Sequence, residues 1–192
     1  MFFNIPNSLT WLRIALLPAF IAVFYIPSDS LSIEVRNITG VLLFVMAGLT
    51  DWLDGFLARK LQQSSAFGAF LDPVADKCVI VVALILLVDF GRTNAILAMI
   101  IISREIAVSA LREWMAEIGR RNSVAVNWIG KFKTGMQIAA ILVLLWANPL
   151  IPHLSTLWLG NVLMWIAAIL TIWSMLYYLN MAMGELFEQE NK

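Results

Sequence analysis

Six apolar stretches, each about twenty residues long, recur along this chain of 192 residues. A helix needs about 20 mostly apolar residues to cross the hydrocarbon core of a bilayer, so each stretch is long enough to form one span. Hydrophobic residues make up 61% of the sequence and charged residues only 14%, which excludes an ordinary soluble domain. The sequence therefore predicts an all-α, polytopic membrane protein with six transmembrane helices, over residues 8–27, 36–56, 70–89, 94–115, 129–148 and 156–181.

The segments between these stretches are short and polar, and the sequence shows no repeat and no low-complexity tract. We therefore expect a single membrane domain over residues 1–192. The N-terminus lacks a basic start and a small-residue cleavage site, so we expect the first span to remain in the mature protein.

Basic residues are distributed unevenly between the two sides that six spans define. Of the 13 lysines and arginines, only Arg36 and Arg92 fall on the side away from the termini. Cytoplasmic loops carry an excess of Lys and Arg, so both termini are expected in the cytoplasm.

Four aspartates interrupt the apolar pattern within one run, DWLDGFLARKLQQSSAFGAFLDPVAD. Asp51 and Asp54 are three residues apart near the end of the second span, and Asp72 and Asp76 are four apart near the start of the third. Each pair therefore shares one face of a helix. The connection, predicted from Lys60 to Phe67, is short enough to bring the two pairs together near the cytoplasmic face.

Carboxylates at the margin of a bilayer are costly, and four of them together would repel one another unless positive charge holds them. Oxygen ligands favour magnesium, manganese or calcium over zinc, and four carboxylates could neutralise two divalent ions. The quartet therefore predicts a two-metal site, a common device for displacement at phosphorus.

Small residues accompany the aspartates. Gly55, Gly68 and Ala58 remove side chains where a helix or a ligand approaches closely, and Arg59 or Lys60 could balance a phosphate. For Gly55 alone, the favoured interpretation is close helix packing, because small residues are common in membrane helix contacts.

The run resembles the signature of the CDP-alcohol phosphatidyltransferase family: D-x-x-D-G-x-x-A-R, eight residues, then G-x-x-x-D-x-x-x-D. Every fixed position matches. The resemblance implies a six-helix enzyme, commonly a homodimer, whose active-site cleft lies at the cytoplasmic interface and which uses two Mg²⁺ or Mn²⁺ ions. It implies that Asp51, Asp54, Asp72 and Asp76 hold the metals and that Asp76 also takes the proton from the acceptor hydroxyl. The implied CDP pocket comprises Asp51, Asp54, Gly55, Ala58, Arg59 and Gly68, together with Asn7 and Thr10 of the opening segment NIPNSLTWLR.

The acceptor is indicated by cations on other segments. Arg13 shares a helix face with Thr10 in the opening segment, Arg104 and Arg112 lie in SREIAVSALREW, and Lys131 and Lys133 lie in GKFKTGMQ. This concentration of positive charge suits an acceptor that already carries a phosphate. Lys131 and Lys133 could instead serve only the topology of a helix end, whereas Arg104 lies deep in its span and is expected to face protein.

These segments are similar to the subgroup of the family that uses sn-glycerol 3-phosphate. The resemblance implies transfer of a phosphatidyl group from CDP-diacylglycerol to glycerol 3-phosphate, with release of CMP, in a bacterial inner membrane. It implies that Arg112, Lys131 and Lys133 bind the acceptor phosphate, with Arg104 in support. Another acceptor, such as inositol phosphate or serine, is the alternative within the family, and a small cation transporter is the alternative outside it. We expect no nucleic-acid partner.

Overall fold

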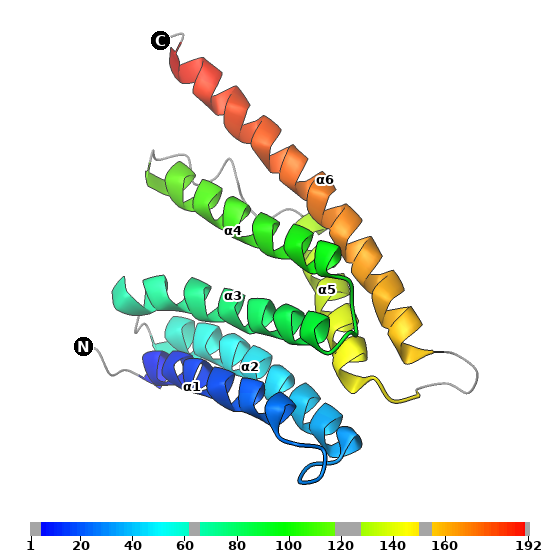
Figure 1. The fold of residues 1–192 in the computed structure, drawn as a ribbon. Helices are drawn as coiled ribbons and strands as arrows, with labels where there is room; N and C mark the ends of the chain where they lie inside the picture. Colours follow the sequence, from blue (N-terminus) through cyan, green and yellow to red (C-terminus); the bar gives the residue numbers. More distant parts are fainter. Residues whose placement is uncertain (1–4, 62–65, 118–127, 150–154, 191–192) are drawn as a thin grey trace. The chain divides into compact units, whose positions relative to one another are not determined.

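The structure is a computed structural model that describes residues 5–61, 66–117, 128–149 and 155–190, and all regular structure in these ranges is α-helical. The helices, shown in Figure 1, are α1 (Ile5–Tyr25), α2 (Ile33–Leu61), α3 (Ala66–Asp89), α4 (Ala95–Glu117), α5 (Trp128–Trp146) and α6 (Thr156–Glu190). The chain divides into two compact units. The first comprises residues 1–92 and 144–156, and the second comprises residues 93–143 and 157–192.

Each of the six predicted segments is helical over most of its length, although α1 ends at Tyr25 and α5 at Trp146, two residues before the predicted ends. Three helical segments of the described chain are long and apolar enough to cross a membrane: Ser8–Tyr25, Ile33–Leu57 and Thr156–Met181. The apolar part of α5, Phe132–Trp146, is shorter. These helices identify a membrane protein.

The connection between the second and third segments is shorter than predicted. Helix α2 continues through Lys60 to Leu61, and α3 already begins at Ala66. The stretch after Asp54 contains Leu, Ala, Arg and Lys and no proline, and these residues favour helix enough to carry it past the single Gly55. Both aspartate pairs therefore lie inside helices and not at their ends.

Helices α1, α2 and α3 pack side by side in the first unit (Figure 1). Phe20 and Phe24 of α1 meet edge to face, with ring centroids 5.7 Å apart, and both are almost fully buried. Gly40 of α2 is required for this packing, because a Cβ there would lie 2.7 Å from Cε2 of Phe24. Burying aromatic rings of this size contributes a large apolar area to the contact between α1 and α2.

A turn at Gly91 ends α3 and positions the side chain of Arg92 within the first unit. Gly91 adopts a positive φ of 65°, its N–H donates to the carbonyl of Val88, and the N–H of Arg92 donates to the carbonyl of Leu87. These are the hydrogen bonds of a Schellman motif, in which glycine takes the left-handed position without steric penalty.

The side chain of Arg92 caps the C-terminal end of α5. Its Nη1 donates to the carbonyls of Leu144 at 3.1 Å and Leu145 at 2.8 Å, and its Nη2 donates to the side chain of Asn37. The guanidinium also lies 5.6 Å from the ring centroid of Phe24. A cation at a helix C-terminus satisfies carbonyls that have no partner within the helix.

Arg36 has a similar environment, since its Nη2 donates to the carbonyl of Ile26, just after α1. Burial, and to a smaller extent the neighbouring Arg36, lower the pKa of Arg92. The two arginines that the sequence places on the sparsely charged side are thus both buried cations that bind backbone carbonyls. They stabilise the structure of the first unit, which explains why two basic residues occur on the side where the sequence otherwise has none.

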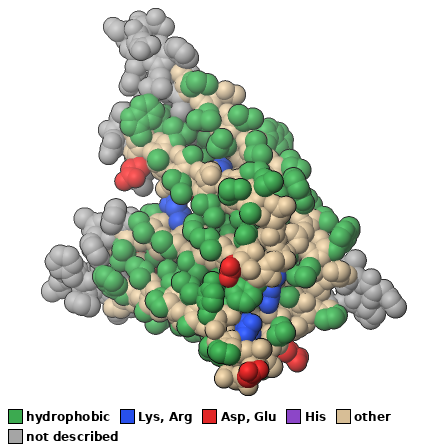
Figure 2. All heavy atoms as spheres, viewed as in Figure 1, with side chains coloured by type: hydrophobic (Ala, Val, Ile, Leu, Met, Phe, Trp, Pro, Cys, Tyr) green, Lys and Arg blue, Asp and Glu red, His purple; other side chains and the backbone are tan. Residues whose placement is uncertain are grey.

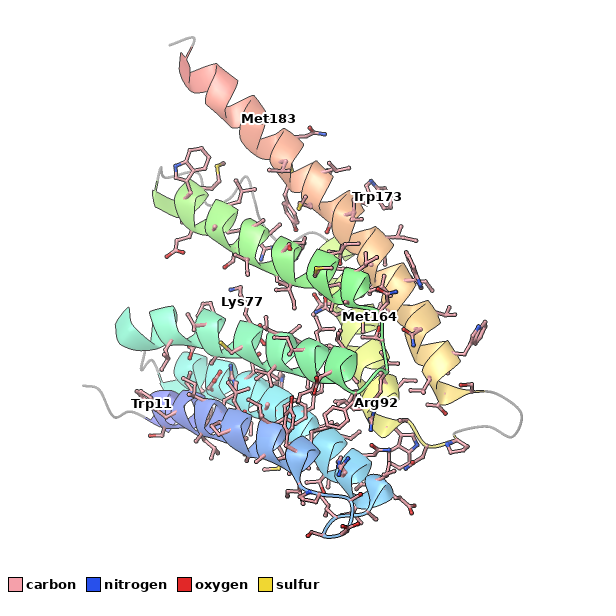
Figure 3. All side chains as sticks on the ribbon, in the orientation of Figure 1. Trp11, Lys77, Arg92, Met164, Trp173 and Met183 are labelled. Atoms are coloured by element: carbon pink, nitrogen blue, oxygen red, sulfur yellow. The ribbon has the colours of Figure 1, made fainter. Side chains whose placement is uncertain are left out.

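Helices α4, α5 and α6 provide the second unit. Val108 and Met115 of α4 pack with Tyr178 of α6 in a buried core. On α6, Trp173 is 61% exposed and projects from the side of the helix turned away from α4 (Figure 3). Hydrophobic side chains cover most of the face shown in Figure 2, with few charged groups among them, as expected for a surface that meets lipid.

Candidate active site

One turn of α1 contacts the acidic residues of α2 and α3 within the first unit. Arg13 is completely buried, and its Nη1 lies 2.8 Å from Oδ1 of Asp51. The other terminal nitrogen, Nη2, donates to Oδ2 of Asp54. Thr10, three residues earlier on the same helix face, donates from Oγ1 to Oδ1 of Asp72 at 2.6 Å. A single turn of α1 therefore holds three carboxylates that come from two other helices.

The three carboxylates differ in exposure. Asp54 is 4% exposed, Asp72 is half-buried, and the side chain of Asp51 is 46% exposed. Asp54 lies close enough to Asp51 and Asp72 for electrostatic repulsion from both to act on it, while the charge of Arg13 opposes that repulsion. The structure thus brings Asp51, Asp54 and Asp72 into one electrostatically coupled cluster.

Asp76 follows Asp72 by four residues on α3, so the two lie on the same helix face. Its side chain is exposed. The neighbouring Lys77, labelled in Figure 3, donates from Nζ to the carbonyl of Pro73 at 3.1 Å. Asp76 is therefore accessible at the side of the cluster, whereas Asp54 is enclosed.

The donor chemistry of the cluster fits a hard divalent cation. Carboxylate oxygens are the ligands that Mg²⁺ and Mn²⁺ prefer. Arg13 contacts one oxygen each of Asp51 and Asp54, and its single positive charge cannot neutralise both carboxylates. Within the described residues, no group of three acidic, His or Cys side chains lies close enough to hold an ion, and Arg13 occupies the position between Asp51 and Asp54. The two-metal site stays a prediction.

Gly55 lies one residue beyond Asp54, in the interior of α2. A Cβ at this position would meet no atom of the described residues within 4 Å. Within the described residues no neighbouring helix approaches it, so the interpretation of Gly55 as a helix-packing glycine gains no support there and stays a prediction. The open space is instead compatible with the alternative, a close ligand.

The remaining predicted pocket residues are described only in part. Gly68 is buried in α3. The side chains of Asn7, Ala58 and Arg59 lie outside the described residues, although their backbones belong to α1 and α2. Lys60, on the next turn of α2, places its Nζ 5.8 Å from the ring centroid of Phe56.

The second unit contains a buried cluster of cations around one carboxylate. Lys133 of α5 is 1% exposed and donates from Nζ to Oε1 of Glu105 on α4. Arg104 donates from Nη1 to the same oxygen at 3.2 Å and from Nη2 to Oγ of Ser174 on α6 at 3.2 Å. Arg104 is 7% exposed, so it faces protein as its depth in the span predicts.

Arg112 lies two turns beyond Arg104 on α4. Its guanidinium stands 5.3 Å from the ring centroid of Tyr178, and its Nη2 donates to the Tyr178 hydroxyl at 3.4 Å. The side chain of Lys131, the fourth predicted acceptor ligand, lies outside the described residues. The structure therefore brings Arg104 and Lys133 together through Glu105 and gives Arg112 a separate contact with α6.

Comparison with known proteins assigns the chain to a family. The sequence profile of CDP-alcohol phosphatidyltransferases matches residues 3–173. The chain belongs to the CDP-alcohol phosphatidyltransferase family. It is similar to a Haemophilus influenzae protein with 50% identity over 190 residues, which is 98% of each chain. It is also similar to an Escherichia coli K12 protein with 47% identity over 191 residues, which covers 98% of this chain and all of that one. Both relatives carry the name CDP-diacylglycerol–glycerol-3-phosphate 3-phosphatidyltransferase.

Membership of the CDP-alcohol phosphatidyltransferases gives the first cluster its chemical setting. The matched residues 3–173 include all four aspartates and also the turn of α1 that carries Thr10 and Arg13. The cluster of Asp51, Asp54 and Asp72 therefore lies within the part of the chain that defines the family.

Sequence reasoning missed the contacts of several residues of this phosphatidyltransferase. Arg13 was counted among the cations that favour an anionic acceptor, but its contacts with Asp51 and Asp54 were not predicted. Ser174 and Tyr178 were not considered. The signal was available, because Thr171, Ser174 and Tyr178 recur at helical spacing within a mainly apolar part of α6, and all three are buried.

Proposed function

We propose that this chain transfers the phosphatidyl group from CDP-diacylglycerol to sn-glycerol 3-phosphate, giving phosphatidylglycerophosphate and CMP. The observation that carries the proposal is the near full-length similarity to relatives whose names specify this donor and this acceptor. The whole chain, residues 1–192, would act as one catalytic domain in the synthesis of anionic phospholipid.

Asp51, Asp54, Asp72 and Asp76 would hold two divalent ions, Mg²⁺ or Mn²⁺, against the diphosphate of the donor. When bound, these ions supply charge neutralisation at the diphosphate and lower the pKa of a hydroxyl near them. Gly55 leaves the space in which the CDP group could approach the helix backbone, since nothing described in the chain fills it. Ala58, Arg59, Gly68, Asn7 and Thr10 would complete the CDP pocket.

Asp76 would act as the general base. The 1-hydroxyl oxygen of glycerol 3-phosphate attacks the phosphorus that carries diacylglycerol, its proton passes to a carboxylate oxygen of Asp76, and the bond from that phosphorus to CMP breaks. The exposure of Asp76 supports this role, because a base must reach an acceptor that arrives from water.

The cations of the second unit would bind the phosphate of the acceptor. Arg112, Lys131 and Lys133 are proposed ligands, and Arg104 would support them. The charge of the described cluster favours an anion, because Arg104, Arg112 and Lys133 are accompanied by Glu105 as their only ion-paired carboxylate within the described residues. Buried cations that exceed their counter-charge are stabilised when a phosphate binds.

The proposed location is the bacterial inner membrane, which the chain would cross six times. Both termini and the active-site cleft would lie on the cytoplasmic side, and the chain would form a homodimer. Helices α3 and α4 would cross the membrane as well, their ionisable groups facing protein or the aqueous site. The distribution of basic residues supports this orientation.

The test is the purified chain supplied with CDP-diacylglycerol and labelled glycerol 3-phosphate, with and without a chelator of divalent ions. We expect labelled lipid and an equal amount of CMP, both lost with chelator and restored by excess Mg²⁺ or Mn²⁺. Serine and inositol phosphate serve as competing acceptors in the same assay. Labelled lipid from either of these, and none from glycerol 3-phosphate, would refute the proposed acceptor.

A further inference from the structure

Arg13 is the most completely buried charged side chain of the first unit, and none of the roles proposed above uses it. It is 0% exposed, and its two terminal nitrogens engage two different carboxylates, those of Asp51 and Asp54. Its Nε is buried without a hydrogen-bond partner.

The position of this guanidinium is that of a counter-ion. Asp54 is enclosed and subject to repulsion from Asp51 and Asp72. Without positive charge between them, burying these carboxylates near one another would be strongly unfavourable. Arg13 supplies that charge from α1, and Thr10 binds the third carboxylate, Asp72, from the same helix turn.

We propose that Arg13 is a built-in counter-ion that competes with divalent cations for the carboxylates of Asp51 and Asp54. This inference rests on the proposed function, because it takes these aspartates to be the ion ligands. When no ion is bound, the contacts of Arg13 with the two carboxylates would keep the acidic cluster folded. An incoming divalent ion takes over their oxygens, and the guanidinium gives up at least one of its two contacts.

The consequence is a trade between stability and ion affinity. Arg13 lets the chain fold before any ion is bound, because the acidic cluster already holds one positive charge. The same charge repels an arriving divalent cation at a few ångströms, where such interactions are large. Arg13 is therefore a positioning residue that lowers the affinity of the site for its ion.

The test measures Mn²⁺ binding to the full chain in detergent, without nucleotide or lipid substrate, by the electron paramagnetic resonance signal of free Mn²⁺. Arg13→Gln removes the charge while keeping a polar side chain of similar reach, and it should bind Mn²⁺ at least about tenfold more tightly than the wild type. Arg13→Lys retains the charge but presents it on a single nitrogen in place of a planar fork, so it should hold the two carboxylates less firmly and bind Mn²⁺ about threefold more tightly than the wild type. Leu12→Ala changes an exposed residue of the same turn and should leave the affinity unchanged.

Thermal unfolding gives an independent readout. Arg13→Gln should have the lowest midpoint without ions and the largest rise on adding Mn²⁺, whereas the Leu12→Ala control should follow the wild type. If Arg13→Gln cannot be purified, the Arg13→Lys comparison decides the question alone. Equal or weaker Mn²⁺ binding by the Arg13 variants would overturn the inference and leave the ion site intact. Absence of Mn²⁺ binding by the wild type and by every variant would instead refute the ion site itself, and the inference with it.

Discussion

The ion pair between Lys133 and Glu105 allows a quantitative test of the second unit. Lys133 is 1% exposed, and Glu105, whose side chain is 23% exposed, is its ion-pair partner. Removing one partner of a buried pair typically costs about 3–5 kcal/mol, because the other charge is left without compensation. Glu105 keeps some access to water, so we expect Glu105→Gln to cost somewhat less, about 2–3 kcal/mol.

The reverse change should cost less. In Lys133→Met the carboxylate of Glu105 still has Arg104, whose Nη1 lies 3.2 Å from Oε1. We expect a loss of about 1–2 kcal/mol, and a double variant that is no less stable than Glu105→Gln alone, because its buried charge is gone as well. The coupling energy of the cycle should therefore exceed about 1 kcal/mol.

The assay is reversible chemical unfolding in detergent, followed by circular dichroism, for the two single variants and the double variant. Glu113→Gln is the matched control, because Glu113 is an exposed carboxylate on the same helix and its loss should change stability by less than about 0.5 kcal/mol. Glycerol 3-phosphate should restore part of the stability lost in Glu105→Gln, since a bound phosphate can replace the missing counter-charge. Losses that add within about 0.5 kcal/mol would refute the reasoning, because they would show that Lys133 does not depend on Glu105.

Three further predictions concern the first unit. Asp76→Asn should abolish CMP release while retention of labelled CDP-diacylglycerol persists, because an amide cannot accept the hydroxyl proton; turnover near the wild-type rate would assign the base elsewhere. Gly55→Ala should leave the unfolding midpoint nearly unchanged and raise the KM for the donor, since a Cβ there would meet none of the described residues within 4 Å, whereas Gly40→Ala should lower the midpoint through its clash with Phe24. A donor KM unaffected by Gly55→Ala would remove this glycine from the pocket. Arg92→Ala should cost at least about 3 kcal/mol in chemical unfolding because two backbone carbonyls lose a charged donor, with Arg92→Lys intermediate, and equal stability of the three proteins would disprove the capping role.

The helices could be predicted from the sequence because apolar length is a local property. The C-terminal end of α2 and the start of α3 could not, since hydropathy falls at the aspartates while both helices continue beyond the apolar stretches. The predicted connection between the second and third segments therefore begins and ends where polarity changes, whereas α2 and α3 both extend into it. Gly55 shows the same limit, because whether a glycine faces a helix or open space depends on a neighbour that the local sequence does not specify.

The aspartates of the candidate site could also be predicted from the sequence, because their pattern is a local property. Their spacing along each helix is local, and it indicated which carboxylates share a face. Their partners were not visible, because Arg13 lies 41 residues from Asp54, Thr10 lies 62 from Asp72, and Lys133 lies 28 from Glu105. Sequence spacing within a helix identifies the charges, whereas only the packing of helices shows which opposite charge compensates each one.

The charges that carry the proposed chemistry are also those that obscure the membrane spans. Among the described residues, α3 and α4 do not qualify as spans by apolarity, although each is long enough. Helix α3 carries Asp72, Asp76 and Lys77, and α4 carries the pair Arg104 and Glu105 as well as Arg112 and Glu113. A bilayer tolerates such groups only when protein or water compensates them, and the contacts of Asp72 with Thr10 and of Glu105 with Lys133 provide that compensation. A helix that is long enough to span but too charged to do so alone is therefore where a functional site is expected in a chain of this composition.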